Sequence, residues 1–263
     1  MHDVEATGTR LRRIAAAPTR TETAFGAWCT LPSSVITEQL ALTDPDYICI
    51  DCQHGLVDYS DMLAMLQAMA RTDVTSVVRV VSHDTGAIGK VLDAGADGVI
   101  VPMVNDRAQA ERVASACRYA PLGIRSYGPV RANATVGSAD ADTLNRHVLC
   151  IVMIETEEGV GNADEICSTS GVDGVYIGPA DLAISLGERP GGLIPGRHTE
   201  AVEHVLRCCQ RNNIIPGIHA YDGATARRYA DMGFRMVTTG VDLGLLRDAV
   251  SNQLGDARRT STP

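Results

Sequence analysis

Eight short apolar runs alternate with helix-like stretches along this chain, and this alternation limits the folds that it can adopt. The runs are rich in Val and Ile and cover residues 24–29, 47–50, 76–81, 98–101, 148–154, 174–177, 215–218 and 236–239. Between them, apolar residues recur at the three- and four-residue spacing of amphipathic helices. The helical patterns cover residues 59–71, 108–119, 157–168, 200–212, 224–232 and 243–254. Eight repeated strand–helix units predict an α/β fold, a (β/α)8 or TIM barrel, and not a sandwich.

The length and composition agree with one such barrel. At 263 residues we predict a single domain over 1–263, with peripheral tails at 1–23 and 255–263. Apolar residues make up 45% of the chain and aromatic ones only 4%, so we expect Ala, Val, Ile, Leu and Met to fill the core.

Charge and cysteine usage exclude several classes of partner. The formal net charge of -9 offers no basic face for nucleic acid or an anionic membrane. No apolar run is long enough to span a bilayer, and residues 1–23 lack the apolar core of a signal peptide. The eight cysteines lie mostly within apolar runs, which predicts reduced thiols. We therefore expect a cytoplasmic protein whose ligands are small molecules.

Polar residues stand at the C-terminal ends of several predicted strands. Asp51 and His54 follow the second strand, Arg79 lies in the third, and Glu155 and Asp181 follow the fifth and sixth. The C-terminal ends of barrel strands meet at one mouth, where active sites lie. We therefore expect these residues to converge, although they are far apart in the sequence.

Glu155 and Asp181 indicate a site for a divalent metal ion. They come from neighbouring strands, and two carboxylates that leave positions open for water and substrate suit Mg²⁺ or Mn²⁺, with Co²⁺ as a further candidate. The alternative is that both carboxylates cap the helices that follow them. The intervening Gly178-Pro-Ala-Asp181 is suited to holding an anion through its backbone N–H groups, or is an ordinary β-to-α turn.

Arg79 and His54 are the candidates for catalysis. A guanidinium within an apolar strand needs an anionic partner. Arg79 is therefore either part of a structural salt bridge or a fork for the oxygen of a 2-oxo acid and its enolate. The imidazole of His54 is suited to general-base catalysis, with Asp51 or Asp93 as the carboxylate that tunes it. His219, after the seventh strand, is a further candidate for a contact with substrate.

These motifs resemble those of the HpcH/HpaI aldolase family, the metal-dependent class II pyruvate aldolases typified by 4-hydroxy-2-oxoheptanedioate aldolase. The resemblance runs from about Phe25 to Leu254. It is carried by seven ordered motifs: Ile50-Asp-Cys-Gln-His54, Val77-Val-Arg79, Val101-Pro-Met-Val104, Arg118-Tyr-Ala-Pro-Leu-Gly-Ile-Arg125, Ile154-Glu-Thr156, Gly174-Val-Tyr-Ile-Gly-Pro-Ala-Asp-Leu182 and Gly240-Val-Asp242.

The resemblance implies a role for each matching residue. Glu155 and Asp181 match the metal ligands, and Arg79 matches the arginine that contacts the pyruvate oxygen. His54 with Asp93 matches a dyad that acts through water as acid and base. The segment that receives the substrate carboxylate is matched by Gly178, Pro179, Ala180 and Asp181, and the loop near the aldehyde by Arg125 and Tyr127.

The resemblance also implies a barrel of the phosphoenolpyruvate/pyruvate-binding type and a homo-oligomer, a hexamer built as a trimer of dimers with the last helix exchanged between subunits. Two positions depart from the family. Gln53 stands where Glu is common, and Met153 stands where Gln is common. Both changes remove polarity or charge near the metal, so we expect acceptor choice, metal preference or rate to differ.

The predicted reaction is the reversible aldol cleavage of a 4-hydroxy-2-oxo acid to pyruvate, or an analogue of it, and an aldehyde through a metal-stabilised enolate. No imine-forming lysine is needed, and the single lysine, Lys90, lies in a helical segment. The alternatives are a CoA-thioester lyase like citrate lyase β-subunits or malyl-CoA lyases, an oxaloacetate decarboxylase, and a catalytically silent ligand-binding barrel. We expect residues 133–145 and 188–198 to form loops that shape the acceptor pocket.

Overall fold

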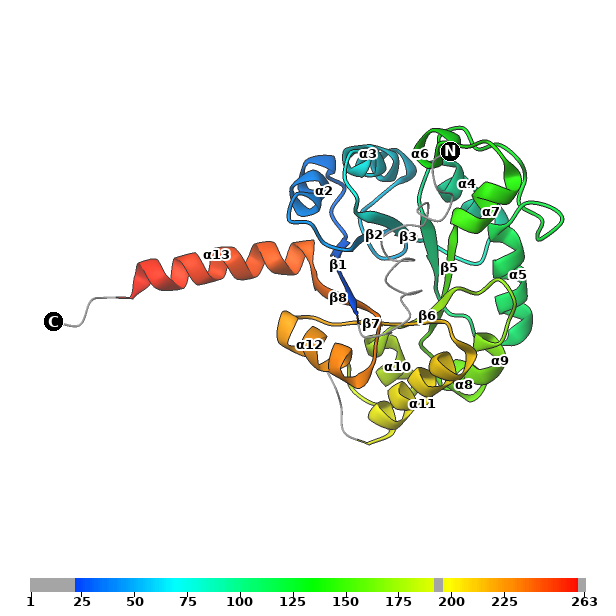
Figure 1. The fold of residues 1–263 in the computed structure, drawn as a ribbon. Coiled ribbons are helices and arrows are strands. Elements are labelled where there is room, and N and C mark those ends of the chain that lie inside the picture. Colours follow the sequence, from blue (N-terminus) through cyan, green and yellow to red (C-terminus); the bar gives the residue numbers. More distant parts are fainter. Residues whose placement is uncertain (1–21, 192–195, 260–263) are drawn as a thin grey trace.

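The computed structural model describes residues 22–191 and 196–259 and shows a closed barrel of eight parallel strands (Figure 1). The strands are β1 (Ala24–Cys29), β2 (Tyr47–Asp51), β3 (Thr75–Arg79), β4 (Gly98–Val101), β5 (Leu149–Ile154), β6 (Gly174–Ile177), β7 (Ile215–His219) and β8 (Met236–Val241). Each strand pairs with its neighbour in the sequence, and β8 pairs with β1 to close the barrel. The predicted (β/α)8 barrel is confirmed, and all eight predicted strands overlap observed ones.

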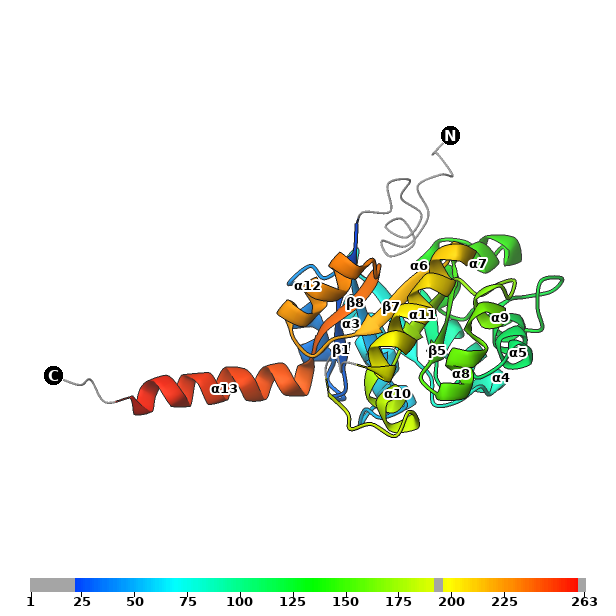
Figure 2. The ribbon, with the colours of Figure 1, turned by 90° about the horizontal axis from the view of Figure 1, so that it is seen from below.

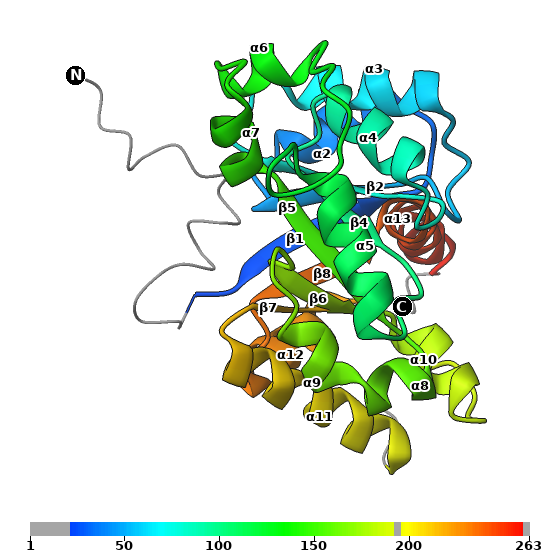
Figure 3. The same ribbon diagram turned by 90° about the vertical axis from the view of Figure 1, so that its right-hand side faces the viewer.

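Helices lie around the outside of the barrel (Figure 3). They are α2 (Ser34–Ala41), α3 (Tyr59–Met69), α4 (Thr85–Asp93), α5 (Arg107–Cys117), α6 (Ala132–Val136), α7 (Ala141–His147), α8 (Glu157–Gly161), α9 (Ala163–Cys167), α10 (Pro179–Ser185), α11 (Arg197–Asn212), α12 (Gly223–Met232) and α13 (Asp242–Arg258). Among the described residues, no helix has the length and apolar character that crossing a membrane requires.

Two expectations about these helices are corrected. The helix predicted over 157–168 is two helices, α8 and α9, which meet at Asn162. The loop predicted over 133–145 contains α6 and most of α7. Gly137 ends α6 in the left-handed conformation, with φ 74°, and the Asp140 side chain caps α7. The other predicted loop, 188–198, falls partly outside the described residues, and its end belongs to α11.

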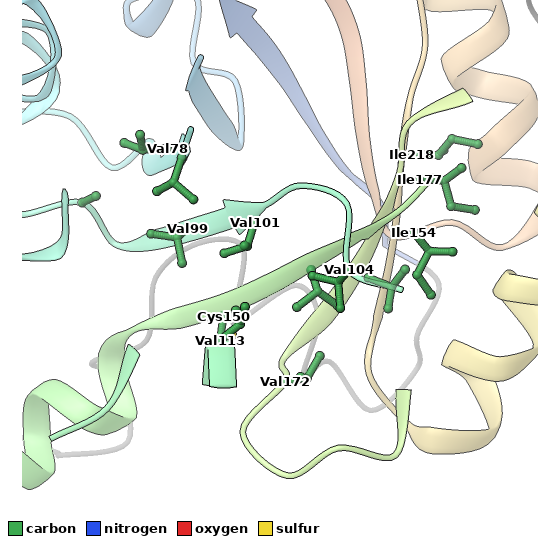
Figure 4. Packing of buried hydrophobic residues seen from close by; sticks show 14 of the residues in the cluster. Val78, Val99, Val101, Val104, Val113, Cys150, Ile154, Val172, Ile177 and Ile218 are labelled. Carbon is green, nitrogen blue, oxygen red and sulfur yellow. The ribbon is translucent and has the colours of Figure 1, made fainter. Parts of the chain in front are cut away.

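The core has two layers that differ in composition. Between the strands and the helices it is mainly aliphatic, with Tyr229 and Phe234 as buried aromatic members. Figure 4 shows Val78, Val99, Ile154 and Ile177 within this layer. The barrel interior also holds large aromatic side chains, namely Trp28, Tyr47 and Tyr176, so the expectation of an aliphatic core holds only for the outer layer. Glycines make room for the rings inside. A Cβ on Gly26 would lie 2.5 Å from the Tyr47 ring, and one on Gly217 would lie 2.7 Å from Tyr176. All eight cysteines are free.

The last helix, α13, projects from the barrel as a straight rod (Figures 1 and 2). Its first residue, Asp242, is buried and accepts hydrogen bonds from the backbone N–H groups of Thr30 and Leu31, which fixes the base of the helix. Farther along, Leu246 and Val250 are at least half exposed. The helix therefore presents apolar side chains that its own barrel does not cover, and it ends four residues beyond the predicted end at Leu254.

Candidate active site

A pocket of about 280 Å³ opens at the C-terminal mouth of the barrel. The residues that line it include eight that the sequence singled out, namely Asp51, His54, Arg79, Gly178, Pro179, Ala180, Asp181 and His219. They come from four places in the chain: the end of β2 and the turn after it, β3, the segment from the end of β6 into α10, and the end of β7. The barrel thus brings most of the predicted site residues to one mouth. Glu155 lies behind Gly178, and Asp93, Arg125 and Tyr127 do not line the pocket.

Arg79 is held by a two-pronged salt bridge to Asp51. Its Nε and Nη2 donate to the two carboxylate oxygens of Asp51 at 2.9 and 2.5 Å, and its guanidinium lies 5.1 Å from the centre of the Trp28 ring. Burial raises the pKa of Asp51, but the hydrogen bonds and charge of Arg79 outweigh it and leave that pKa below its ordinary value. The buried guanidinium therefore has the anionic partner that it needs, and its orientation is fixed, with Nη1 outside the fork.

Asp51 accepts hydrogen bonds from the backbone of the following turn and not from the imidazole of His54. Its Oδ1 accepts the backbone N–H of Gln53 at 3.0 Å and that of His54 at 3.2 Å. The turn is tight, because a Cβ on Gly55 would lie 2.2 Å from the carbonyl oxygen of Asp51. The His54 side chain is exposed at the rim of the pocket, where it can meet a bound ligand.

Glu155 is a buried carboxylate with one unused oxygen. It is only 2% exposed, and its Oε1 accepts the backbone N–H of Met103 at 2.8 Å. Among the described residues, its buried Oε2 has no hydrogen-bond partner. Burial raises the pKa of Glu155 to about 7; the Met103 N–H opposes this rise, and the negative charge of Asp181 adds to it. The positive charge of Arg79 also lowers this pKa, but no hydrogen-bond donor among the described residues meets Oε2.

A divalent cation fits this arrangement. It would satisfy the orphaned Oε2 and offset the repulsion between the two carboxylates. Gly178 keeps the space open, since a Cβ there would lie 2.3 Å from Oε2. The described residues contain no group of three or more His, Cys, Asp or Glu side chains placed to hold a metal. Glu155 and Asp181 would therefore supply two ligands, and water and substrate oxygens the others, as Mg²⁺ commonly requires.

The capping alternative for the two carboxylates does not hold. Thr156, not Glu155, caps α8 through its side chain. The N-cap of α10 is Gly178, and no side-chain cap hydrogen bond is present there, although Asp181 lies in the first turn. Neither carboxylate is therefore occupied by a helix end.

Asp93 is paired with Arg125 and not with His54 within one chain, so the dyad stays a prediction. Asp93 ends α4, which runs back from the mouth, and nearby Asp97 binds the backbone N–H of Ser76 at the start of β3. In a barrel the N-terminal strand ends lie on the face opposite the mouth. Asp93 pairs there with Arg125 at 2.7 Å. The carboxylate predicted to pair with His54 therefore lies on the outside of the barrel.

Several residues of the site were not predicted from the sequence. Trp28 and Tyr176 line the pocket from inside the barrel, where the alternation of a strand alone does not separate site from core. Met103 binds Glu155 through its backbone in the left-handed conformation, with φ 57°, and this is rare for a residue with a side chain. Only its position just after β4 signals a role. Tyr221, two residues after β7, also lines the pocket.

Comparisons with known proteins bear on this site. The model of the family described as "HpcH/HpaI aldolase/citrate lyase" matches residues 24–249. The chain belongs to the HpcH/HpaI aldolase/citrate lyase family. A protein of Rhizorhabdus wittichii named hydroxypyruvate/pyruvate aldolase is 39% identical over 238 residues, which are 89% of this chain and 94% of that protein.

Two further members of the family extend the comparison. A 5-keto-4-deoxy-D-glucarate aldolase of Klebsiella pneumoniae is 34% identical over 236 residues, which are 89% of this chain and 91% of that one. The crystal structure of a family protein from Burkholderia cenocepacia superposes with a TM-score of 0.88 at 31% identity, covering 95% of this chain and 98% of that one. The predicted family, fold and class of enzyme, an aldolase-type carbon–carbon lyase, are confirmed.

The state of Glu155 predicts how stability depends on pH. Its folded pKa of about 7 lies above the ordinary 4.5. The contribution of protonated Glu155 to the free energy of unfolding is therefore complete below about pH 4.5 and is lost as the pH rises through about 7. Without metal, this loss is roughly 3 kcal/mol. We expect Glu155→Gln to be more stable than the wild type at pH 8 in EDTA, by urea unfolding, but not at pH 5.

The matched control is Glu158→Gln, which removes an exposed carboxylate three residues away. It should follow the wild type at both pH values. Added Mn²⁺ should stabilise the wild type and the control, but not Glu155→Gln. Equal stability of Glu155→Gln and wild type at pH 8 in EDTA would show that Glu155 carries no electrostatic cost.

Proposed function

We propose that the protein is a class II, divalent-metal-dependent aldolase that cleaves a 4-hydroxy-2-oxo acid, reversibly, to pyruvate or a pyruvate analogue and an aldehyde. The observation that carries the proposal is the orphaned Oε2 of Glu155 facing Asp181, beside a fixed guanidinium. The names of the relatives support it, because they are aldolases of 2-oxo acids. The cofactor is proposed to be Mg²⁺ or Mn²⁺, with Co²⁺ as a substitute.

Glu155 and Asp181 hold the cation in this proposal. When bound, the ion acts as a Lewis acid on the carboxylate and 2-oxo oxygens of the substrate and makes the proton on C3 removable. Arg79 donates a hydrogen bond to the 2-oxo oxygen, and this bond strengthens as negative charge develops there. Because Asp51 fixes the guanidinium in advance, little reorganisation is needed at that moment. The backbone of Gly178, Pro179, Ala180 and Asp181 receives the substrate carboxylate.

His54 is proposed to move the proton of the 4-hydroxyl through a water molecule, since its exposed side chain stands at the rim on the aldehyde side. Lys90 takes no part, because its ammonium lies over the Tyr59 ring at 4.5 Å, outside this pocket. An imine route therefore has no amine among the residues that line the mouth.

The working form is proposed to be a cytoplasmic homo-oligomer, a hexamer in which α13 packs on a neighbouring copy. The exposed Leu246 and Val250 of the projecting helix support the first part, and the free cysteines support a reducing compartment. In such an assembly Asp93, on the outer surface, would complete the site of a neighbouring subunit by reaching its His54. This placement reconciles the predicted dyad with the distance between the two residues in one chain.

Enolate formation can be measured without knowing the aldehyde. In D₂O with Mg²⁺ or Mn²⁺, we expect the wild type to exchange the methyl protons of pyruvate, seen by NMR, and EDTA to abolish the exchange. Arg79→Lys keeps the charge but not the fork, and should lower the exchange rate about 10²-fold.

Arg118→Lys is the matched control, because Arg118 is equally buried and pairs with Asp173 at 2.8 Å, but away from the pocket. Its exchange rate should stay near that of the wild type. Exchange that persists in EDTA, or an equal loss in both variants, would contradict the proposed roles of the metal and of Arg79.

The shared site predicts complementation between two inactive variants. His54→Ala and Asp93→Asn should each lose about 10²-fold in aldol cleavage. When the two are co-expressed, mixed oligomers contain sites that combine an intact His54 with an intact Asp93, and activity should return. The fractions are separated by two affinity tags, and each variant alone is the control. A mixed oligomer as inactive as its parents would show that Asp93 does not act at a neighbouring His54.

A further inference from the structure

His219 is a half-buried histidine of the pocket to which the proposed mechanism gives no role. It ends β7, and its ring meets the Trp28 ring edge to face at 5.2 Å and the Tyr221 ring at 5.3 Å. Burial lowers its pKa to about 4, and the positive charge of Arg79 adds to this effect. The imidazole is therefore neutral at neutral pH, with one nitrogen that donates and one that accepts.

A chain of buried hydroxyl groups leads from the barrel interior to this imidazole. The Tyr47 hydroxyl lies 2.9 Å from Oγ1 of Thr238, which lies 2.6 Å from the Tyr176 hydroxyl. The Tyr176 hydroxyl in turn lies 3.5 Å from Nδ1 of His219. All three hydroxyl-bearing side chains are fully buried, and burial raises the pKa of both tyrosines above the ordinary value. Each hydroxyl therefore keeps its proton.

The direction of the hydrogen bonds in this chain determines the tautomer of His219. Three hydroxyl protons are available for the three contacts. If each is donated towards the mouth, from Tyr47 to Thr238 to Tyr176 to Nδ1, every proton has an acceptor. In the opposite direction the Tyr47 proton would have none of these acceptors, and a buried donor without an acceptor is costly. Nδ1 is therefore the acceptor, and the proton is on Nε2, the nitrogen that does not face the Tyr176 hydroxyl.

The position of Nε2 identifies the part of the substrate that it can meet. Arg79 and His219 stand against the same Trp28 ring, at 5.1 and 5.2 Å. In the proposed function Arg79 binds the 2-oxo oxygen and His54 serves the aldehyde side. With the substrate held in this way, C3, the carbon between these two groups, would lie near Trp28 and the imidazole. A neutral N–H donor at that place cannot form a hydrogen bond with the methyl group of pyruvate, but it can donate one to a hydroxyl group on C3.

We propose that His219 is a specificity-determining residue that donates a hydrogen bond from Nε2 to the C3 hydroxyl of a 3-hydroxy-2-oxo acid, so that the enzyme selects this class of nucleophile over pyruvate. The inference rests on the proposed function, because it needs the 2-oxo group at Arg79. It adds the identity of the nucleophile. The metal, Arg79 and His54 do not determine this identity, because they would act in the same way on pyruvate and on a 3-hydroxy-2-oxo acid.

The test compares exchange at C3 of hydroxypyruvate and of pyruvate in D₂O, with the full chain and saturating Mn²⁺. The wild type should show a higher kcat/KM for hydroxypyruvate. His219→Phe keeps an aromatic ring but loses the donor, and should lower the ratio of the two kcat/KM values about tenfold. His219→Asn keeps an N–H donor and should retain part of the preference. Tyr176→Phe removes the hydroxyl that sets the tautomer and should lower the ratio to a smaller extent.

The control is His204→Phe, the same substitution on α11, outside the pocket, and it should keep the wild-type ratio. A ratio in His219→Phe equal to that of the wild type, with the variant folded by circular dichroism, overturns this inference while the proposed function stands. ¹⁵N NMR of the His219 ring provides a second readout independent of turnover, and a proton on Nδ1 instead of Nε2 also overturns it. Exchange of neither acid by the metal-loaded wild type would instead refute the proposed function.

Discussion

The buried carboxylate of Glu155, with one oxygen unpaired and a second carboxylate in front of it, is the constraint on which the mouth of this barrel depends. Such an arrangement is unfavourable by itself, because burial and the charge of Asp181 both oppose ionisation. The surrounding structure nevertheless maintains it. Gly178 leaves the space in front of Oε2 open, and Met103 takes a left-handed conformation to hold Oε1. An unsatisfied oxygen kept at this cost is the main support for the proposed cation site.

The pocket also contains a pair of opposite charges, Arg79 and Asp51. Arg79 and Asp51 neutralise each other in a fixed fork, and Trp28 supports both through the guanidinium contact and its own N–H. The orientation of the guanidinium is therefore fixed in advance, which is the condition that the proposed stabilisation of an enolate requires. Arg79 and Asp181 line the same pocket, and the interior aromatic residues Trp28 and Tyr176 supply apolar surface there.

The strand and helix pattern predicted the barrel because tertiary structure agrees with local periodicity throughout it. The positions of Arg79, Glu155 and Asp181 at strand ends were sufficient to place the site. The failures have physical causes. The separation of Asp93 from His54 within one chain was not foreseen, because a motif carries no information on which end of the barrel a helix returns to. The short helices α6 and α7 depend on caps at Gly137 and Asp140 and not on apolar periodicity. Met103 acts through its backbone N–H, and its side-chain type therefore gives no sign of this role.

Whether one cation joins the two carboxylates can be observed directly by anomalous X-ray diffraction from crystals soaked in Mn²⁺. The account predicts one strong anomalous peak between Oε2 of Glu155 and the carboxylate of Asp181, and its loss in crystals of Asp181→Asn. A peak at another position at saturating Mn²⁺, or none in the wild type while Glu155 still lacks a partner, would contradict it.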